Sequence, residues 1–149
     1  MKKLLTAAAL AAMATGASAE DVKLQLKWVT QAQFAGYYVA QAKGYYEEEG
    51  LNVTILPGGP DIAPTQVMAG GGADVMVDWM PSALAAREKG LPLVNIAQPF
   101  ASSGMMLTCM ADSGIKEPKD FADKTLGVWF GGNEYPFLSW MSQLGLKTD

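Results

Sequence analysis

The chain has 149 residues, with 11 Lys and Arg against 15 Asp and Glu, no histidine and one cysteine, and its formal net charge is −4. An acidic balance argues against nucleic acid and anionic membranes as partners. The absence of histidine excludes Ser-His-Asp and Cys-His nucleophile schemes and the commonest metal ligand, and a single cysteine excludes an intramolecular disulfide. We therefore expect no catalytic residues, no metal site and no cofactor.

The first 19 residues have the pattern of a secretory signal peptide. Lys2 and Lys3 precede an apolar run over 4–13, and Ala17-Ser18-Ala19 forms a cleavage site of the A-x-A type. No cysteine adjoins this site, so we expect an unlipidated mature chain that begins at Glu20 and is exported to the periplasm. No later apolar run approaches the length needed to cross a bilayer, so the mature protein is not expected to be membrane-embedded.

Between the signal peptide and residue 72, two strands alternate with helices. Residues 22–28 alternate apolar and polar side chains, and residues 51–56 carry Val53 and Ile55 on one face, which predicts a strand in each range. Helices are expected over 34–42, over a short turn at 45–49, and over 61–68 with Asp61 as N-cap.

The pattern of residues 73–90 predicts a strand that is followed directly by a helix. The apolar run Val75–Val77 has strand length, Pro81 suits a first helical turn, and Gly90 suits the position after a helix ends. Asp78 and Trp79 lie at the junction, where a carboxylate beside an indole could hold a flat, hydrogen-bonding molecule. The alternative is that Asp78 only caps the helix and Trp79 only covers the edge of the sheet.

The second half of the chain continues the alternation. Strands are expected over 91–96, 105–110 and 125–130, a short helix start over 115–122, and a helix over 134–144. Cys109 lies in an apolar run and is expected to be a small core residue. The whole pattern predicts an α/β fold with a parallel-type sheet flanked by helices.

Right-handed crossovers bring the carboxyl ends of parallel strands to one edge of the sheet, where ligands of open α/β sheets bind. Aromatic and polar side chains follow several of the expected strands. Each also has a structural alternative, such as packing at the sheet edge, a solvated loop amide, a plain turn or a helix cap. The candidate ligand-binding residues are Trp28, Gln33, Phe34, Tyr37, Gly59, Asp78, Trp79, Phe100, Trp129, Asn133 and Glu134.

Several segments together carry a family resemblance. They are Leu26-Lys27-Trp28, Phe34 to Ala40, Lys43 to Val53, Met68-Ala69-Gly70 leading to Ala73-Asp74-Val75, and Lys119 to Val128. The combination resembles the solute-binding proteins of bacterial ABC importers, in the branch that includes thiamine-pyrimidine-precursor binders and related nitrate, sulfonate and flavin-type binders.

The resemblance implies a type II periplasmic-binding-protein-like fold, in which two lobes close on a ligand. Residues 20–104 are then expected to form lobe one, and 105–149 the crossover and the start of lobe two. Such proteins are about twice this length, so the chain is expected to be a fragment of a protein that is a monomer at full length. The implied partners are a small-molecule ligand and the permease and ATPase of an importer.

Two other classes of function stay open. Related fungal proteins make the thiamine pyrimidine with His and Cys residues, and the absence of His argues against such an enzyme here. A sensor receptor could also use the same clamp. The aromatic candidates and the acceptors Asp78 and Glu134 favour a small nitrogen heterocycle, first pyrimidine-like and second flavin-like, over nitrate or a sulfonate.

Overall fold

A computed structural model describes residues 18–148, so nearly all of the expected signal peptide lies outside the described residues. Strand β1 (Glu20–Gln25) pairs in parallel with β2 (Leu51–Leu56), from Glu20 opposite Leu51 to Gln25 opposite Leu56. The short strand β3 (Val75–Met76) joins the other side of β1, which gives the order β2-β1-β3. The expected parallel sheet is thus confirmed.

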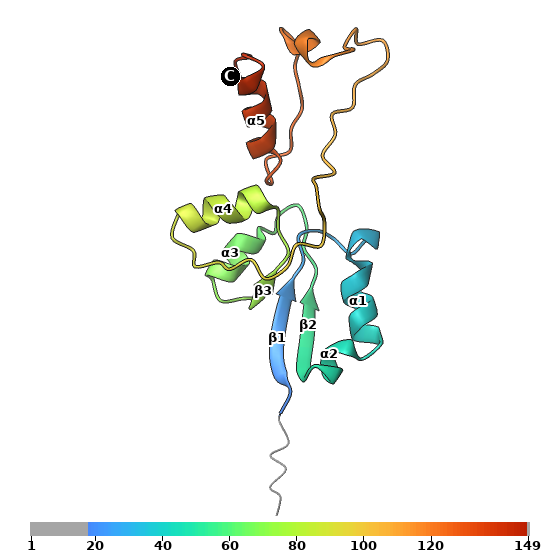
Figure 1. Cartoon of the computed structure of the whole chain (residues 1–149), viewed down its shortest axis with the longest axis vertical. Helices are drawn as coiled ribbons and strands as arrows, with labels where there is room; N and C mark the ends of the chain where they lie inside the picture. The colour runs from blue at the N-terminus through green and yellow to red at the C-terminus, as the bar shows by residue number, and fades with distance from the viewer. Residues whose placement is uncertain (1–17, 149) are drawn as a thin grey trace, which may run out of the picture.

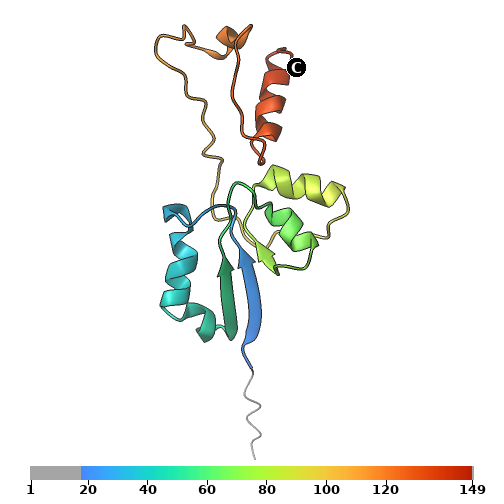
Figure 2. The same cartoon turned by 180° about the vertical axis from the view of Figure 1, so that it is seen from behind.

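Helices flank this sheet on both sides. The 3-10 turn η1 (Ala32–Phe34) runs into α1 (Ala35–Ala42) and α2 (Tyr45–Glu48), which connect β1 to β2. Helices α3 (Pro64–Ala69) and α4 (Met80–Glu88) precede and follow β3. Figures 1 and 2 show α1 and α2 beside β2, and α3 and α4 on the side of β3. The α/β class predicted from the alternation is confirmed.

The first core forms where the period-two pattern of the strands meets the helices. Leu24 and Leu26 from the β1 segment and Val53 from β2 are buried together with Phe34, which ends η1. Gln25 is buried on the opposite face of β1, and its Nε2 donates to the carbonyl oxygens of Leu26 and Pro57. A buried carboxamide is tolerated there because its donors have backbone acceptors.

The second half of the chain has a separate core. An extended segment (residues 91–117) connects α4 to the 3-10 turn η2 (Pro118–Phe121), and the chain then returns to α5 (Glu134–Gln143), as Figure 1 shows. Phe121, Phe137 and Met141 are buried in this core. The backbone N–H groups of Lys116 and Glu117 donate to the carboxylate of Asp120, and these bonds lower the pKa of Asp120.

Three expected strands do not form a ladder. The ranges 91–96, 105–110 and 125–130 have no strand pairing in the structure, so these predictions are wrong for the residues that it describes. Val94 and Ile96 are 79% and 76% exposed. Their composition favours a strand, but strand formation also needs a neighbouring backbone to supply hydrogen bonds, and the described part of the chain brings none alongside.

Two smaller expectations also differ from the structure. Helix α3 begins at Pro64, with Ala63 rather than Asp61 as its N-cap, because proline is preorganised for the first helical position. Cys109 is exposed rather than part of the core, since the run 105–110 has no neighbouring strand against which to pack.

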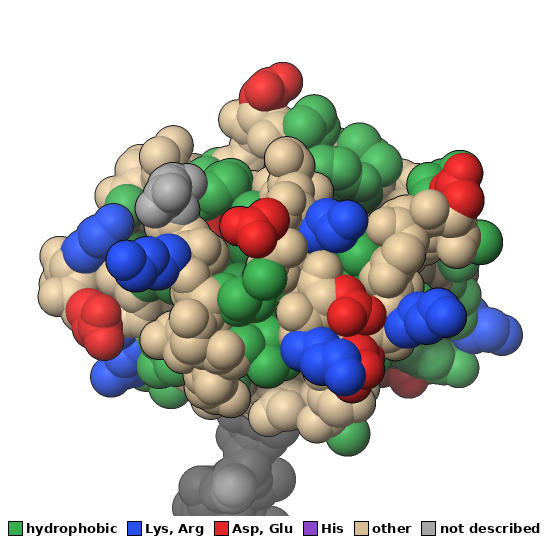
Figure 3. Space-filling model, turned by 90° about the horizontal axis from the view of Figure 1, so that it is seen from above, with side chains coloured by type: hydrophobic (Ala, Val, Ile, Leu, Met, Phe, Trp, Pro, Cys, Tyr) green, Lys and Arg blue, Asp and Glu red, His purple; other side chains and the backbone are tan. Residues whose placement is uncertain are grey.

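Charges of both signs lie on one face of the molecule, and none of the described helices is a candidate membrane span. Figure 3 shows acidic, basic and hydrophobic side chains interspersed on the face seen from above, without a large patch of one sign. Across residues 18–148, no helix combines the length and the apolar character needed to span a bilayer.

Candidate ligand-binding site

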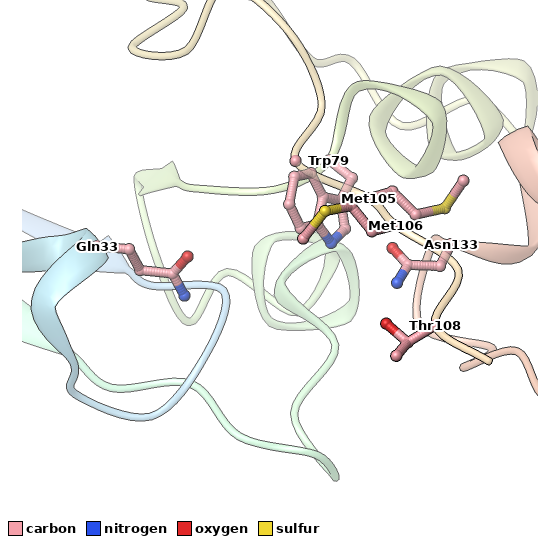
Figure 4. Close-up of a pocket in the computed structure, with 7 residues that line it drawn as sticks. Gln33, Trp79, Met105, Met106, Thr108 and Asn133 are labelled. Atoms are coloured by element: carbon pink, nitrogen blue, oxygen red, sulfur yellow. The ribbon is translucent and has the colours of Figure 1, made fainter. Parts of the chain in front are cut away.

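A cavity of about 440 Å³ opens where the two halves of the chain meet. Gln33 reaches it from η1, Trp79 from the start of α4, and Asn133 from the start of α5, while the extended segment supplies Met105, Met106, Thr108 and Gly104. Figure 4 shows the carboxamide of Gln33 on the side opposite Asn133 and Thr108, with the Trp79 indole between them. This volume lies in the range of small-molecule sites.

Two helix N-termini adjoin the cavity. Trp79 is the N-cap residue of α4 and Asn133 that of α5, and neither makes a capping hydrogen bond with its side chain. Both side chains therefore remain available to a bound molecule. The backbone N–H of Gly132, just before α5, donates to Glu134 Oε2 at 2.7 Å, so this carboxylate already has a partner within its own turn.

Among the residues that the structure describes, none with a charged side chain lines this cavity. It offers two carboxamides, one hydroxyl, one indole and two thioethers. Carboxamides and hydroxyls both donate and accept hydrogen bonds, the indole N–H donates, and thioethers pack well against aromatic rings. Such a lining suits a neutral, flat molecule that carries both donors and acceptors. Among the described residues, no group of three or more His, Cys, Asp or Glu side chains could hold a metal ion.

The sequence predicts that Asp78 contacts a ligand, but in the structure it pairs with Lys27. Its Oδ1 lies 2.6 Å from Lys27 Nζ and also accepts the backbone N–H of Trp79 at 2.7 Å. The Asp78 side chain is only 3% exposed, so it does not line the cavity. A sequence scan for cations at the ends of strands overlooks Lys27, because it sits inside an alternating strand pattern.

Two predicted aromatic residues form a pair next to this ion pair. The rings of Trp28 and Trp129 are 5.0 Å apart at an interplanar angle of 76°, an edge-to-face contact. Trp129 also lines a smaller cavity of about 80 Å³, which shares Asn133, Met105 and Met106 with the larger one. The structure therefore brings Gln33, Trp79, Asn133 and Trp129 to the two cavities, with Trp28 behind Trp129.

The remaining predicted residues lie elsewhere. Phe34 is buried in the first core, and Tyr37 packs against that core, where burial raises the pKa of its hydroxyl. Gly59 is buried in the turn after β2 and bridges to Ile62. Phe100 is 61% exposed on the extended segment. None of these four residues lines either cavity.

Sequence reasoning missed the part of the lining that comes from the extended segment. Met105, Met106 and Thr108 belong to a run for which the sequence predicts a strand, Gly104 directly precedes it, and methionines in such runs are usually core residues. The available signal was Thr108, a hydroxyl in an otherwise mostly apolar run. A polar side chain at such a position indicates that one side of the run faces a polar space.

We expect Gly132→Ala to separate the two helix N-termini. Gly132 has φ +121°, a conformation that strains any residue with a side chain, and a Cβ there would lie 2.9 Å from Trp79 Cδ1 and also too close to Ser82 Oγ. The substitution should lower the free energy of unfolding by about 1–3 kcal/mol in a urea titration. Gly127→Ala is the control, because a Cβ at that position meets nothing within 4 Å. Equal midpoints for both variants would contradict this contact.

Comparison with known proteins places this sequence in a family. Residues 31–149 match the model of a family described as NMT1/THI5 like. The chain is 32% identical to the formylaminopyrimidine-binding protein of Halalkalibacterium halodurans over 108 residues, which are 72% of this chain and 33% of that protein.

Further relatives carry names from thiamine chemistry. A Haemophilus influenzae protein named for thiamine biosynthesis is 26% identical over 130 residues, covering 87% of this chain and 41% of its own length. The 4-amino-5-hydroxymethyl-2-methylpyrimidine phosphate synthase of Legionella pneumophila is 30% identical over 115 residues, covering 77% and 36%. The chain thus spans a third to two fifths of the length of these relatives.

The family match covers most of the chain, and the family has the periplasmic-binding-protein-like fold with the kind of parallel, helix-flanked sheet seen here. The resemblance to the thiamine-pyrimidine-precursor branch, read from the sequence, is confirmed by these relatives. The chain belongs to the NMT1/THI5-like family.

Proposed function

We propose that the chain is part of a solute-binding protein that captures a small, neutral, pyrimidine-like heterocycle. The observation that carries the proposal is the cavity of about 440 Å³, to which residues 18–148 contribute an indole, two carboxamides and a hydroxyl but no charged side chain. An aminopyrimidine fits this chemistry, because its flat ring can stack on the indole while its ring nitrogens and amino group pair with donors and acceptors. A relative named as a formylaminopyrimidine-binding protein supports the same ligand class.

The same proposal includes the wider context. The bound molecule would be delivered to the permease and ATPase of an ABC importer, and the chain would act in the periplasm after cleavage of residues 1–19. The two cores of the structure, one within residues 22–77 and one within 107–146, suit a clamp with a lobe boundary near residue 104.

A second function, pyrimidine synthesis, is favoured by the relatives that are named as phosphate synthases. The sequence has no histidine, and Cys109 is its single cysteine. Cys109 is exposed on the extended segment and does not line either cavity. Neither residue type is therefore placed to act on a molecule in the cavity, and we propose binding rather than catalysis.

Calorimetry on the full-length protein tests the proposed function. We expect 4-amino-5-hydroxymethyl-2-methylpyrimidine to bind at about micromolar concentration or tighter, which corresponds to roughly −8 kcal/mol. Riboflavin should bind more weakly, and nitrate and methanesulfonate should show no heat of binding, because no described residue lining the cavity supplies a cation to neutralise them. Tight binding of nitrate, or formation of a pyrimidine phosphate during incubation, would overturn the proposal.

A further inference from the structure

An ion pair lies buried at the carboxyl ends of two neighbouring strands. Lys27 follows β1 and Asp78 follows β3, and these strands pair in parallel, so both side chains emerge at the same edge of the sheet. Lys27 Nζ lies 2.6 Å from Asp78 Oδ1, and the two side chains are 13% and 3% exposed. Removing two charges from water costs about as much as their attraction returns, so stability alone is a weak reason for such a pair.

The bonding capacity of the pair is only partly used. Asp78 Oδ1 accepts from Lys27 and from the Trp79 backbone, whereas the buried Oδ2 has no hydrogen-bond partner among the described residues. An ammonium group has three donors, and the Lys27 ammonium also lies 5.9 Å from the centroid of the Trp129 ring. At that distance a cation is attracted to the face of an indole, most strongly where water is excluded.

Trp129 connects this cation to the wall of the site. Its ring meets Trp28 edge to face, and the indole also folds over Gly131, where any Cβ would overlap the ring. Trp129 lines the smaller cavity together with Asn133, and the intervening Gly132 packs on Trp79. The position of Trp129 therefore affects the start of α5 and, through it, both cavities.

We propose that Lys27 is a positioning residue for the candidate site: held in place by Asp78, its ammonium fixes the Trp129 indole against Trp28 and so fixes the wall formed by Trp129 and Asn133. Lys27 does not line either cavity, so it acts through Trp129 rather than by touching the bound molecule. Its role in ligand affinity rests on the proposed function, whereas its hold on the indole pair does not.

The test separates this role from simple fold stability. Lys27→Met removes the cation but leaves the Asp78 carboxylate buried without its counter-charge, and this variant is expected to be destabilised. The double variant Lys27→Met with Asp78→Leu replaces both charges by apolar groups and should fold as stably as the wild type. Lys27→Arg keeps the cation. Lys23→Met is the matched control, because Lys23 is exposed on β1, the strand that Lys27 follows, and the contact that it makes with Asp74 uses its backbone N–H.

The readout for the indole pair is the exciton couplet of Trp28 and Trp129 in circular dichroism, assigned by its loss in Trp129→Phe. We expect the couplet to persist in Lys27→Arg and Lys23→Met and to disappear in the double variant although that variant is fully folded. An unchanged couplet in the double variant would overturn the proposal, whatever the ligand.

Ligand affinity is the second readout and is measured by calorimetry with 4-amino-5-hydroxymethyl-2-methylpyrimidine. The double variant should bind about tenfold more weakly, and Lys27→Arg within about threefold of the wild type. A double variant that loses the couplet but binds as tightly as the wild type would overturn the positioning role. If the wild type binds no pyrimidine, the proposed function fails, and the couplet alone still decides whether Lys27 holds Trp129.

Discussion

Gly58→Ala is expected to lower the free energy of unfolding by about 3 kcal/mol, a large effect for one added methyl group. The backbone N–H of Gly58 donates to the carbonyl oxygen of Trp28 at 2.9 Å, so the turn after β2 crosses directly over the chain that leaves β1. A Cβ at Gly58 would lie 2.5 Å from the carbonyl carbon of Lys27 and 2.6 Å from the nitrogen of Trp28. Because these are backbone atoms, they move only if the β1–β2 register is disturbed.

The measurement is a urea titration followed by far-ultraviolet circular dichroism, and Gly36→Ala is the control. A Cβ at Gly36, in α1, meets nothing within 4 Å, and alanine favours a helix over glycine. This control should therefore raise the free energy of unfolding by about 0.5 kcal/mol. Gly58→Ala should also weaken ligand binding, because the backbone that it displaces carries Lys27 and Trp28. A wild-type midpoint for Gly58→Ala would show that the crossing is looser than the structure has it.

The sequence predicts those elements whose hydrogen bonds are met by neighbouring segments. Strand β2 matches the expected range 51–56, and α5 ends one residue before the expected end of its helix. In both cases the spacing of the apolar residues and the flanking glycines predict the element correctly, because the apolar face of each element packs into a core. Local pattern and global fold point the same way here.

The wrong strand predictions concern segments whose own residues do not show whether a neighbouring strand is present. An apolar run such as 105–110 indicates which side chains favour burial, but not whether another strand lies within hydrogen-bonding distance. The structure leaves this run extended, with Met106 85% exposed and Met105 against the cavity. Sequence reasoning therefore assigned to a strand the segment that supplies one wall of the candidate site.

The site itself was predictable to the level of the sheet edge. Gln33, Trp79, Trp129 and Asn133 were expected from their places after strands or at helix starts, and these are the residues that the cavities share with the prediction. The pairing of Asp78 with Lys27 was not predictable, because it depends on two strands lying side by side in parallel. This pairing changes the expected chemistry, since the Asp78 carboxylate binds Lys27 instead of a ligand and the described residues that line the cavity carry no charge.

Trp79→Ala is expected to weaken binding of 4-amino-5-hydroxymethyl-2-methylpyrimidine at least tenfold, or about 1.4 kcal/mol. The indole is 38% exposed and, in the described part of the chain, is the one aromatic side chain that lines the larger cavity. It offers a face on which a pyrimidine can stack and an N–H that can donate to a ring nitrogen. Trp79→Phe keeps a ring but loses that donor, so its affinity for the pyrimidine should lie between those of the wild type and Trp79→Ala.

Calorimetry of the full-length variants measures this loss, and Tyr45→Ala is the control. Tyr45 is an aromatic residue on α2, 50% exposed, and it lies outside both cavities, so its removal should leave the affinity unchanged. Trp79 is only the N-cap residue of α4 and makes no side-chain capping bond, so Trp79→Ala should keep most of the helix content of the wild type. Wild-type affinity in a folded Trp79→Ala protein would mean that the pyrimidine binds elsewhere, and the proposed site would be wrong.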